Sequence, residues 1–130
     1  MNLLSRRAVV AVICLGFAVS PAGAATSESE SAITAGLNAA AKAKLAVSEK
    51  RVTSGQWVES NEAAGFVPAA DAPARINIGS GGAISILYTT PAELEGASIV
   101  LTPSAADAGV VKWSCEGSGI PAELLPQGCK

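Results

Sequence analysis

The chain has 130 residues, a formal net charge of −2 and no histidine. This length suits one small domain, and the lack of histidine excludes Ser-His-Asp catalysis and histidine-ligated zinc. Hydrophobic residues make up 49% of the chain, which excludes a disordered protein, but aromatic residues make up only 4%. We therefore expect one domain with a core of small aliphatic side chains.

The first 24 residues have the three parts of an export signal. A short basic segment precedes the uncharged apolar run 8–19, and small residues lead up to a cleavage site after Ala24. The apolar run is shorter than the roughly 20 residues that a membrane-spanning helix needs. We expect residues 1–24 to be removed, which leaves a single domain over residues 25–130 with no stable membrane anchor.

The basic pair Arg6-Arg7 leaves two export routes open, a general secretory signal and a twin-arginine signal. Cys14 lies inside the apolar run and follows Ile13, not a small residue, so we reject a lipoprotein signal. Loss of the basic pair makes the mature chain more acidic than the full chain. We therefore expect no nucleic-acid partner, because such binding relies on a basic surface.

The chain has three cysteines, and Cys14 would leave with the signal. Cys115 and Cys129 remain, and in an exported protein we expect them to form a disulfide, with two free thiols as the alternative. A closed loop of about 15 residues adds about 3 kcal/mol of stability on the chain-entropy model. Trp113 is expected to pack on this disulfide.

Residues 27–54 predict one long helix. Ser27 and Glu30 form a capping box at its start, strong helix formers fill its middle, and Gly55 follows as a typical C-terminal stop. Gly36 is its weak position. An apolar stripe, mostly at four-residue spacing, is expected to pack on the rest of the domain. This stripe consists of Ile33, Leu37, Ala41, Leu45 and Val52.

The middle of the chain predicts a loop and then strands. Residues 56–73 show no periodicity and contain glycine and proline breakers, with Trp57 and Phe66 expected to hold this loop to the domain. After residue 73 the apolar residues alternate, as in strands with one buried face. Pro103 is expected to end the third strand. The expected strands, with a glycine-rich turn at 79–82 between the first two, cover residues 75–78, 83–88, 97–102 and 109–114.

The last segment, residues 115–130, is predicted to be a disulfide-bounded loop with one helical turn at 121–125. A long helix followed by a run of strands indicates an α+β fold, with the helix packed on one face of a four-stranded antiparallel meander. The sequence contains no phosphate-binding loop, no nucleophile elbow and no clustered carboxylates. We therefore expect no enzyme and no metal or cofactor site.

The C-terminal sequence resembles that of type IV pilins. Residues 111–115 are Val-Lys-Trp-Ser-Cys, and residues 120–129 are Ile-Pro-Ala-Glu-Leu-Leu-Pro-Gln-Gly-Cys. In that family the last strand carries Trp-x-Cys, and a second cysteine closes a loop close to the C-terminus. Residues 43–55 resemble the second half of the pilin helix, and residues 99–103 resemble the strand before the one that bears the disulfide.

The resemblance implies a helix on a four-stranded sheet and a disulfide-bounded terminal region, in agreement with the order of elements read from the residues. It also implies an exposed interaction loop, whose candidate residues are Glu116, Gly117, Ser118, Gly119, Ile120 and Pro121. The N-terminus departs from the family, because Pro21 stands where pilins have a glutamate and the apolar run precedes Gly16-Phe17. We therefore expect a pilin-like globular domain with an ordinary export signal.

Two hypotheses about function follow. The first is a non-enzymatic structural or adhesion protein of the bacterial envelope, which acts with pilins or pilus-assembly proteins of a type IV pilus or a related secretion system. It would be periplasmic, extracellular or associated with pili. The alternative is a soluble exported module that uses the pilin fold to bind a glycan, DNA or a small molecule, since a fold does not fix a function. The first needs a flat patch and the second a concave site.

Overall fold

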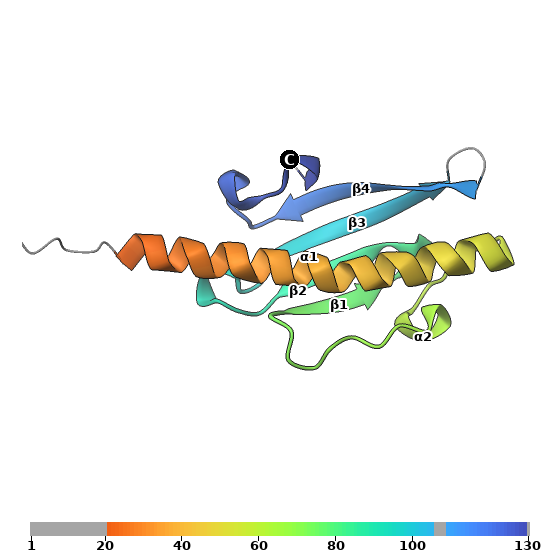
Figure 1. The fold of residues 1–130 in the computed structure, drawn as a ribbon, viewed down its shortest axis with the longest axis horizontal. Helices are drawn as coiled ribbons and strands as arrows, with labels where there is room; N and C mark the ends of the chain where they lie inside the picture. Colours follow the sequence, from red (N-terminus) through yellow and green to blue (C-terminus); the bar gives the residue numbers. More distant parts are fainter. Residues whose placement is uncertain (1–20, 106–108, 130) are drawn as a thin grey trace, which may run out of the picture.

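The computed structural model describes residues 21–105 and 109–129, so the expected export signal lies almost entirely outside the described residues. A long helix comes first, followed by a short helix, four strands and several 3-10 turns (Figure 1). The helices and strands are α1 (Pro21–Ser54), α2 (Asn61–Ala64), β1 (Ala74–Ile78), β2 (Ile84–Tyr88), β3 (Ser98–Ala105) and β4 (Val111–Ser118).

The four strands form one antiparallel sheet in the order β1-β2-β3-β4. Figure 1 shows α1 crossing one face of this sheet, with the disulfide-bearing strand β4 at one edge and β1 at the other. The α+β fold with a helix on a four-stranded meander is therefore confirmed. Alternation along each strand puts one set of side chains under α1 and leaves the other set largely exposed.

The core lies between α1 and the sheet and consists mainly of small aliphatic side chains, as the composition predicts. From the helix it takes alanines and two larger residues, Ile33 and Val47. Its largest strand residues, all 5% exposed or less, are Ile76, Ile78, Ile84, Ile86, Tyr88, Ile99 and Leu101. With so few aromatic residues available, a row of isoleucines supplies the volume that fills the space under the helix.

The helix starts earlier than its sequence signals indicate. We expected a capping box at Ser27, but this is wrong, because α1 begins at Pro21 and Ser27 lies inside it. Proline suits the first turn of a helix, and the alanines after it are strong helix formers. Ser29 is fully buried instead, and its hydroxyl donates a hydrogen bond to Glu93 at 3.0 Å, so it joins α1 to the loop between β2 and β3.

The predicted packing stripe is wrong for Ala41, Leu45 and Val52. Leu45 and Val52 are 61% and 67% exposed and Ala41 is exposed, whereas Ile33 is buried and Leu37 partly buried. One turn takes 3.6 residues, so each four-residue step places the next side chain about 40° further around the helix. A row at this spacing therefore winds away from the sheet. The buried row mixes three- and four-residue steps. It consists of Ser29, Ala32, Gly36, Ala40, Ala43 and Val47.

The strands differ from the prediction mainly in length. β3 continues through Pro103 to Ala105, so the expectation that Pro103 ends it is wrong. Beyond Leu101, β3 pairs only with β4, and a residue without an N–H is tolerated where one side of a strand has no partner. β4 starts later than expected and continues to Ser118, three residues beyond Cys115.

Candidate functional site

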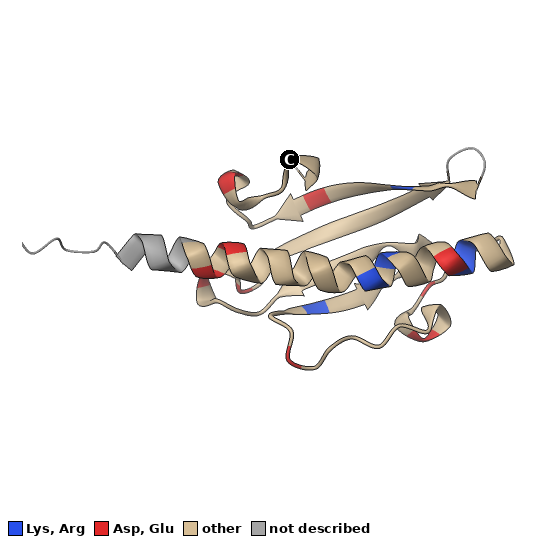
Figure 2. Cartoon of the chain, in the orientation of Figure 1, with Lys and Arg blue, Asp and Glu red and all other residues tan. Residues whose placement is uncertain are grey.

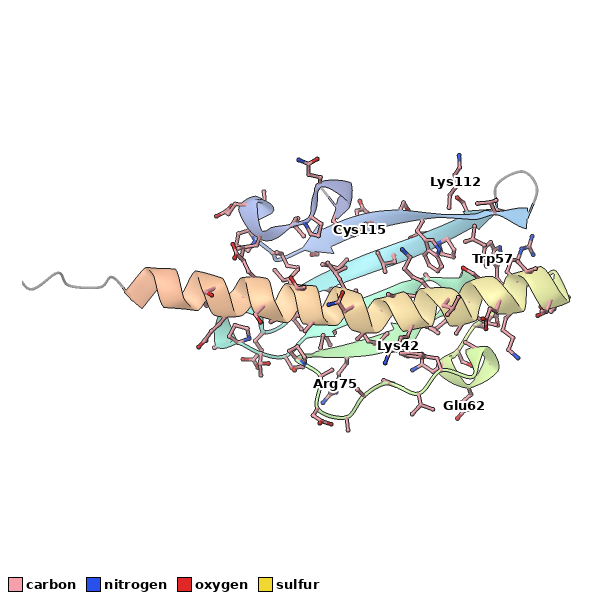
Figure 3. All side chains as sticks on the ribbon, viewed as in Figure 1. Lys42, Trp57, Glu62, Arg75, Lys112 and Cys115 are labelled. Carbon is pink, nitrogen blue, oxygen red and sulfur yellow. A yellow bond between two sulfur atoms is a disulfide. The ribbon has the colours of Figure 1, made fainter. Side chains whose placement is uncertain are left out.

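The C-terminal segment is bound to the sheet by the disulfide between Cys115 of β4 and Cys129, whose Cα atoms are 4.4 Å apart (Figure 3). The segment includes the 3-10 turn Ala122–Leu124, which confirms the expected helical turn. A Cβ atom added at Gly117 would lie 2.6 Å from a methyl carbon of Leu125. This part of the chain therefore packs closely onto the inward face of β4 and extends the core.

The predicted interaction loop does not form one continuous loop. Glu116, Gly117 and Ser118 belong to β4, where they pair with β3. Gly117 lies under Leu125, and Ile120 is partly buried against the core. The prediction failed here because Gly117 was taken as a loop residue, whereas the glycine with a positive φ just after the strand is Gly119. The members that remain exposed are Glu116, Ser118, Gly119 and Pro121.

A second candidate surface lies on the solvent side of α1. We call Ala41, Leu45 and Val52 the exposed α1 row, since they lie within about 40° of one another around the helix. Leu45 and Val52 are among the most exposed large apolar side chains of the described residues. Figure 2 shows acidic residues on the first half of α1 and mostly basic residues on the second half. The exposed α1 row therefore lies on the more basic part of the helix.

Both tryptophans contact the helix. The Lys44 ammonium lies 5.5 Å from the ring centroid of Trp113, and the Arg51 guanidinium lies 4.8 Å from that of Trp57. Each ring is partly buried against the core. Trp57 thus holds the segment after α1 to the domain, as expected (Figure 3), and each cation–π contact adds about 0.5–1 kcal/mol.

The short helix α2 was not predicted, although Ser60 is a good N-cap and accepts a hydrogen bond from the Ala63 N–H at 3.0 Å. Its first residue, Asn61, has a specific role at the edge of the sheet. The Asn61 side chain accepts a hydrogen bond from the Ile78 N–H at 2.7 Å and donates one to the Ile76 carbonyl at 3.3 Å. It occupies backbone groups that a further strand would otherwise bind.

The alternative hypothesis needs a concave site, and two of the open cavities of the described residues lie beside β1 and beside α1. One, of about 570 Å³, lies between the segment before β1 and the β1 edge, and Arg75 is its charged residue. The other, of about 470 Å³, lies between the first half of α1 and the loop at Pro91, and Glu28 is its charged residue. Alanine and proline supply much of both linings. Asn77 and Thr89 also line the first cavity, and Ser31 and Thr90 also line the second.

The titratable groups of the described residues form no metal-binding cluster of three or more histidine, cysteine or carboxylate side chains. Among residues 21–105 and 109–129, no helix combines the length and the apolar character needed to cross a membrane. Tyr88 is fully buried, and burial raises its pKa to about 12. Its hydroxyl donates a hydrogen bond to the Ile33 carbonyl, which is a structural contact between β2 and α1.

Comparison with known proteins gives one family. A family model described as pilin (bacterial filament) matches residues 29–130. The matched range contains most of α1, the whole sheet and both cysteines of the disulfide. A search of curated proteins found no match.

Proposed function

Because this chain belongs to the pilin family, a family of structural and not enzymatic proteins, we propose that it is a structural or adhesion subunit of a type IV pilus or a related secretion system. The observation that carries this proposal is the family match over residues 29–130, since it includes the helix, the sheet and the disulfide together. The partners in this proposal are other pilins or pilus-assembly proteins.

The exposed α1 row is the proposed contact with a neighbouring pilin. α1 buries one row of side chains on its own sheet, and the exposed α1 row faces away from that sheet. Burying apolar surface contributes about 25 cal/mol per Å², so Leu45 and Val52 can both add to such a contact. The nearby Lys42 is exposed as well, which favours a partner surface with acidic residues.

The proposed role also requires that the chain be exported from the cytoplasm. We propose that residues 1–24 direct the chain out of the cytoplasm and are then removed, so that residues 25–130 act in the periplasm or outside the cell. The disulfide between Cys115 and Cys129 supports this compartment, because disulfides persist in oxidising environments. N-terminal sequencing of the exported protein tests the cleavage site, and we expect Ala25 as the first residue.

The function is tested by isolating pili from cells that produce the tagged chain. We expect the chain to fractionate with sheared pili, and to be lost from that fraction when the genes for pilus assembly are deleted. The matched control is an unrelated exported protein with the same tag. A chain that stays entirely in the soluble envelope fraction, with no pilin bound to it after purification, would contradict the proposal.

A further inference from the structure

The face of the sheet that points away from α1 carries two neighbouring rows of side chains that cross all four strands. We call these two rows the outer block. In the first row, cross-strand pairing joins Arg75, Leu87, Ser98 and Ser118. In the second row it joins Asn77, Ser85, Val100 and Glu116.

The outer block has apolar side chains at its centre and charged side chains at its edges. Leu87 and Val100 lie diagonally across the two central strands, and they are 40% and 37% exposed. The charged members lie at opposite edges, Arg75 on β1 (Figure 3) and Glu116 on β4, and both are exposed. The other members are serines and one asparagine. On β2, β3 and β4 such short side chains leave a flat surface with an apolar centre, and Arg75 and Asn77 of β1 line the cavity beside it.

This arrangement is self-complementary. When two sheets pack face to face about a two-fold axis that lies between them and runs roughly along the strands, each edge strand of one copy faces the opposite edge strand of the second copy. Arg75 of one copy then faces Glu116 of the other, and the same contact occurs again on the other side of the axis. Leu87 and Val100 of both copies meet around the axis. Equal charges on the two edges would instead repel at both contacts.

The dimensions permit this contact. The strands that carry Arg75 and Glu116 are three strand spacings apart, about 14 Å. Sheets that pack face to face lie about 10 Å apart, a gap that an arginine and a glutamate side chain bridge together. The central side chains of the outer block are short enough to allow this approach.

We propose that the outer block is a docking surface for a second copy of this chain, with reciprocal Arg75–Glu116 ion pairs around an apolar centre. The contact is smaller than the roughly 800 Å² per partner of stable complexes, so single copies associate weakly. The consequence for pili rests on the proposed function: repeated copies along two filaments would join them side by side through multivalency.

The test uses purified exported protein, with association measured by sedimentation equilibrium up to about 1 mM at low salt. Wild type is expected to form a weak dimer that dissociates as salt is added. Arg75→Glu and Glu116→Arg each place like charges at both contacts, and we expect each variant alone to associate roughly tenfold more weakly.

An equimolar mixture of the two single variants is the decisive sample. In a mixed dimer one contact joins the introduced acidic and basic side chains, and the other joins the native Arg75 and Glu116. We therefore expect the mixture to regain association within about threefold of wild type. Lys112→Glu is the matched control, because Lys112 lies on the same face outside the outer block, and it should change association less than about twofold.

Three results would overturn the proposal: a wild type that stays monomeric over the whole concentration range, single variants that associate like wild type, or a mixture that does not recover. All these substitutions are of exposed residues, so the unfolding temperature should be unchanged. A thermal unfolding measurement on each variant verifies that it is folded. The measurement needs no filament, so a negative result leaves the pilus role standing. Equally, absence of the chain from pili does not affect the solution dimer.

Discussion

Gly36 of α1 lies directly against Tyr88 of β2. A Cβ atom added at position 36 would be 2.6 Å from the Tyr88 hydroxyl oxygen and 2.8 Å from its Cε1 atom. The same hydroxyl donates a hydrogen bond to the Ile33 carbonyl at 3.0 Å, one turn earlier in the helix. The residue with the lowest helix propensity in this part of α1 is therefore the residue that lets the helix approach the central strands.

Gly36→Ala should destabilise the domain by about 1–3 kcal/mol, because the new methyl group overlaps a fully buried ring. Helix propensity alone predicts the opposite, a gain of about 1 kcal/mol. Urea unfolding measures the difference. Asn38→Ala is the matched control on the exposed side of α1, and it should leave stability unchanged or slightly higher. A Gly36→Ala variant as stable as wild type would contradict the close contact.

Stability should fall at alkaline pH because of Tyr88. Below pH 10 the phenol is neutral in both the folded and the unfolded chain, so its ionisation does not affect stability. Between pH 10 and about 12 the unfolded chain loses the proton while the folded chain keeps it. The free energy of unfolding should therefore fall by up to about 1.4 kcal/mol per pH unit in this window.

This prediction can be measured directly because Tyr88 is the only tyrosine of the chain. The absorbance of tyrosinate should titrate near pH 12 in the folded protein and near 10 in denaturant. Tyr88→Phe should remove this part of the pH dependence. A native titration near pH 10 would mean that the hydroxyl is exposed.

Asn61→Ala should lower the free energy of unfolding by about 1–3 kcal/mol, because the Ile78 N–H loses its hydrogen-bond acceptor. It should also increase aggregation, since the edge of β1 becomes free to pair with another strand. Asn61→Asp keeps an acceptor for the Ile78 N–H but loses the donor to the Ile76 carbonyl, so we expect an intermediate effect. Unfolding and light scattering on the three proteins test this order, and equal values for all three would contradict it.

Cys115→Ser should lower stability by about 3 kcal/mol by opening the loop to Cys129. The difference from wild type should disappear when both proteins are unfolded in reductant, because wild type then loses the same bond. Wild type that is equally stable with and without reductant would contradict a stabilising disulfide. Gly117→Ala keeps both cysteines but places a methyl group against Leu125. The stability of this variant therefore measures the packing of Leu125 on β4 separately from the disulfide.

Part of the structure follows directly from the sequence. Alternating isoleucines such as Ile76 and Ile78 predict strands with one buried face, and the run of strands after one helix predicts the meander. The cysteine count predicts the disulfide. These features depend on local periodicity or on residue type alone, and the structure contains all of them.

Other features depend on contacts between distant residues. Ala41 and Ala43 have the same helix propensity, but only Ala43 faces the sheet, because the rotation of α1 is set by packing of the whole buried row. The role of Gly36 becomes visible only with Tyr88 opposite it. Glu116 was predicted to lie in a loop, but its pairing with Val100 places it on the sheet.

The central claim, that the exposed α1 row contacts pilin subunits, is tested most directly by photo-crosslinking in cells that make pili. A photoreactive side chain replaces Leu45, and in a matched control it replaces Val67, which is 87% exposed on the loop after α2. Both sites are exposed, so neither substitution should alter folding. We expect crosslinks to pilin subunits from position 45 and none from position 67. No pilin crosslink from position 45, with the chain present in the envelope, would contradict this account.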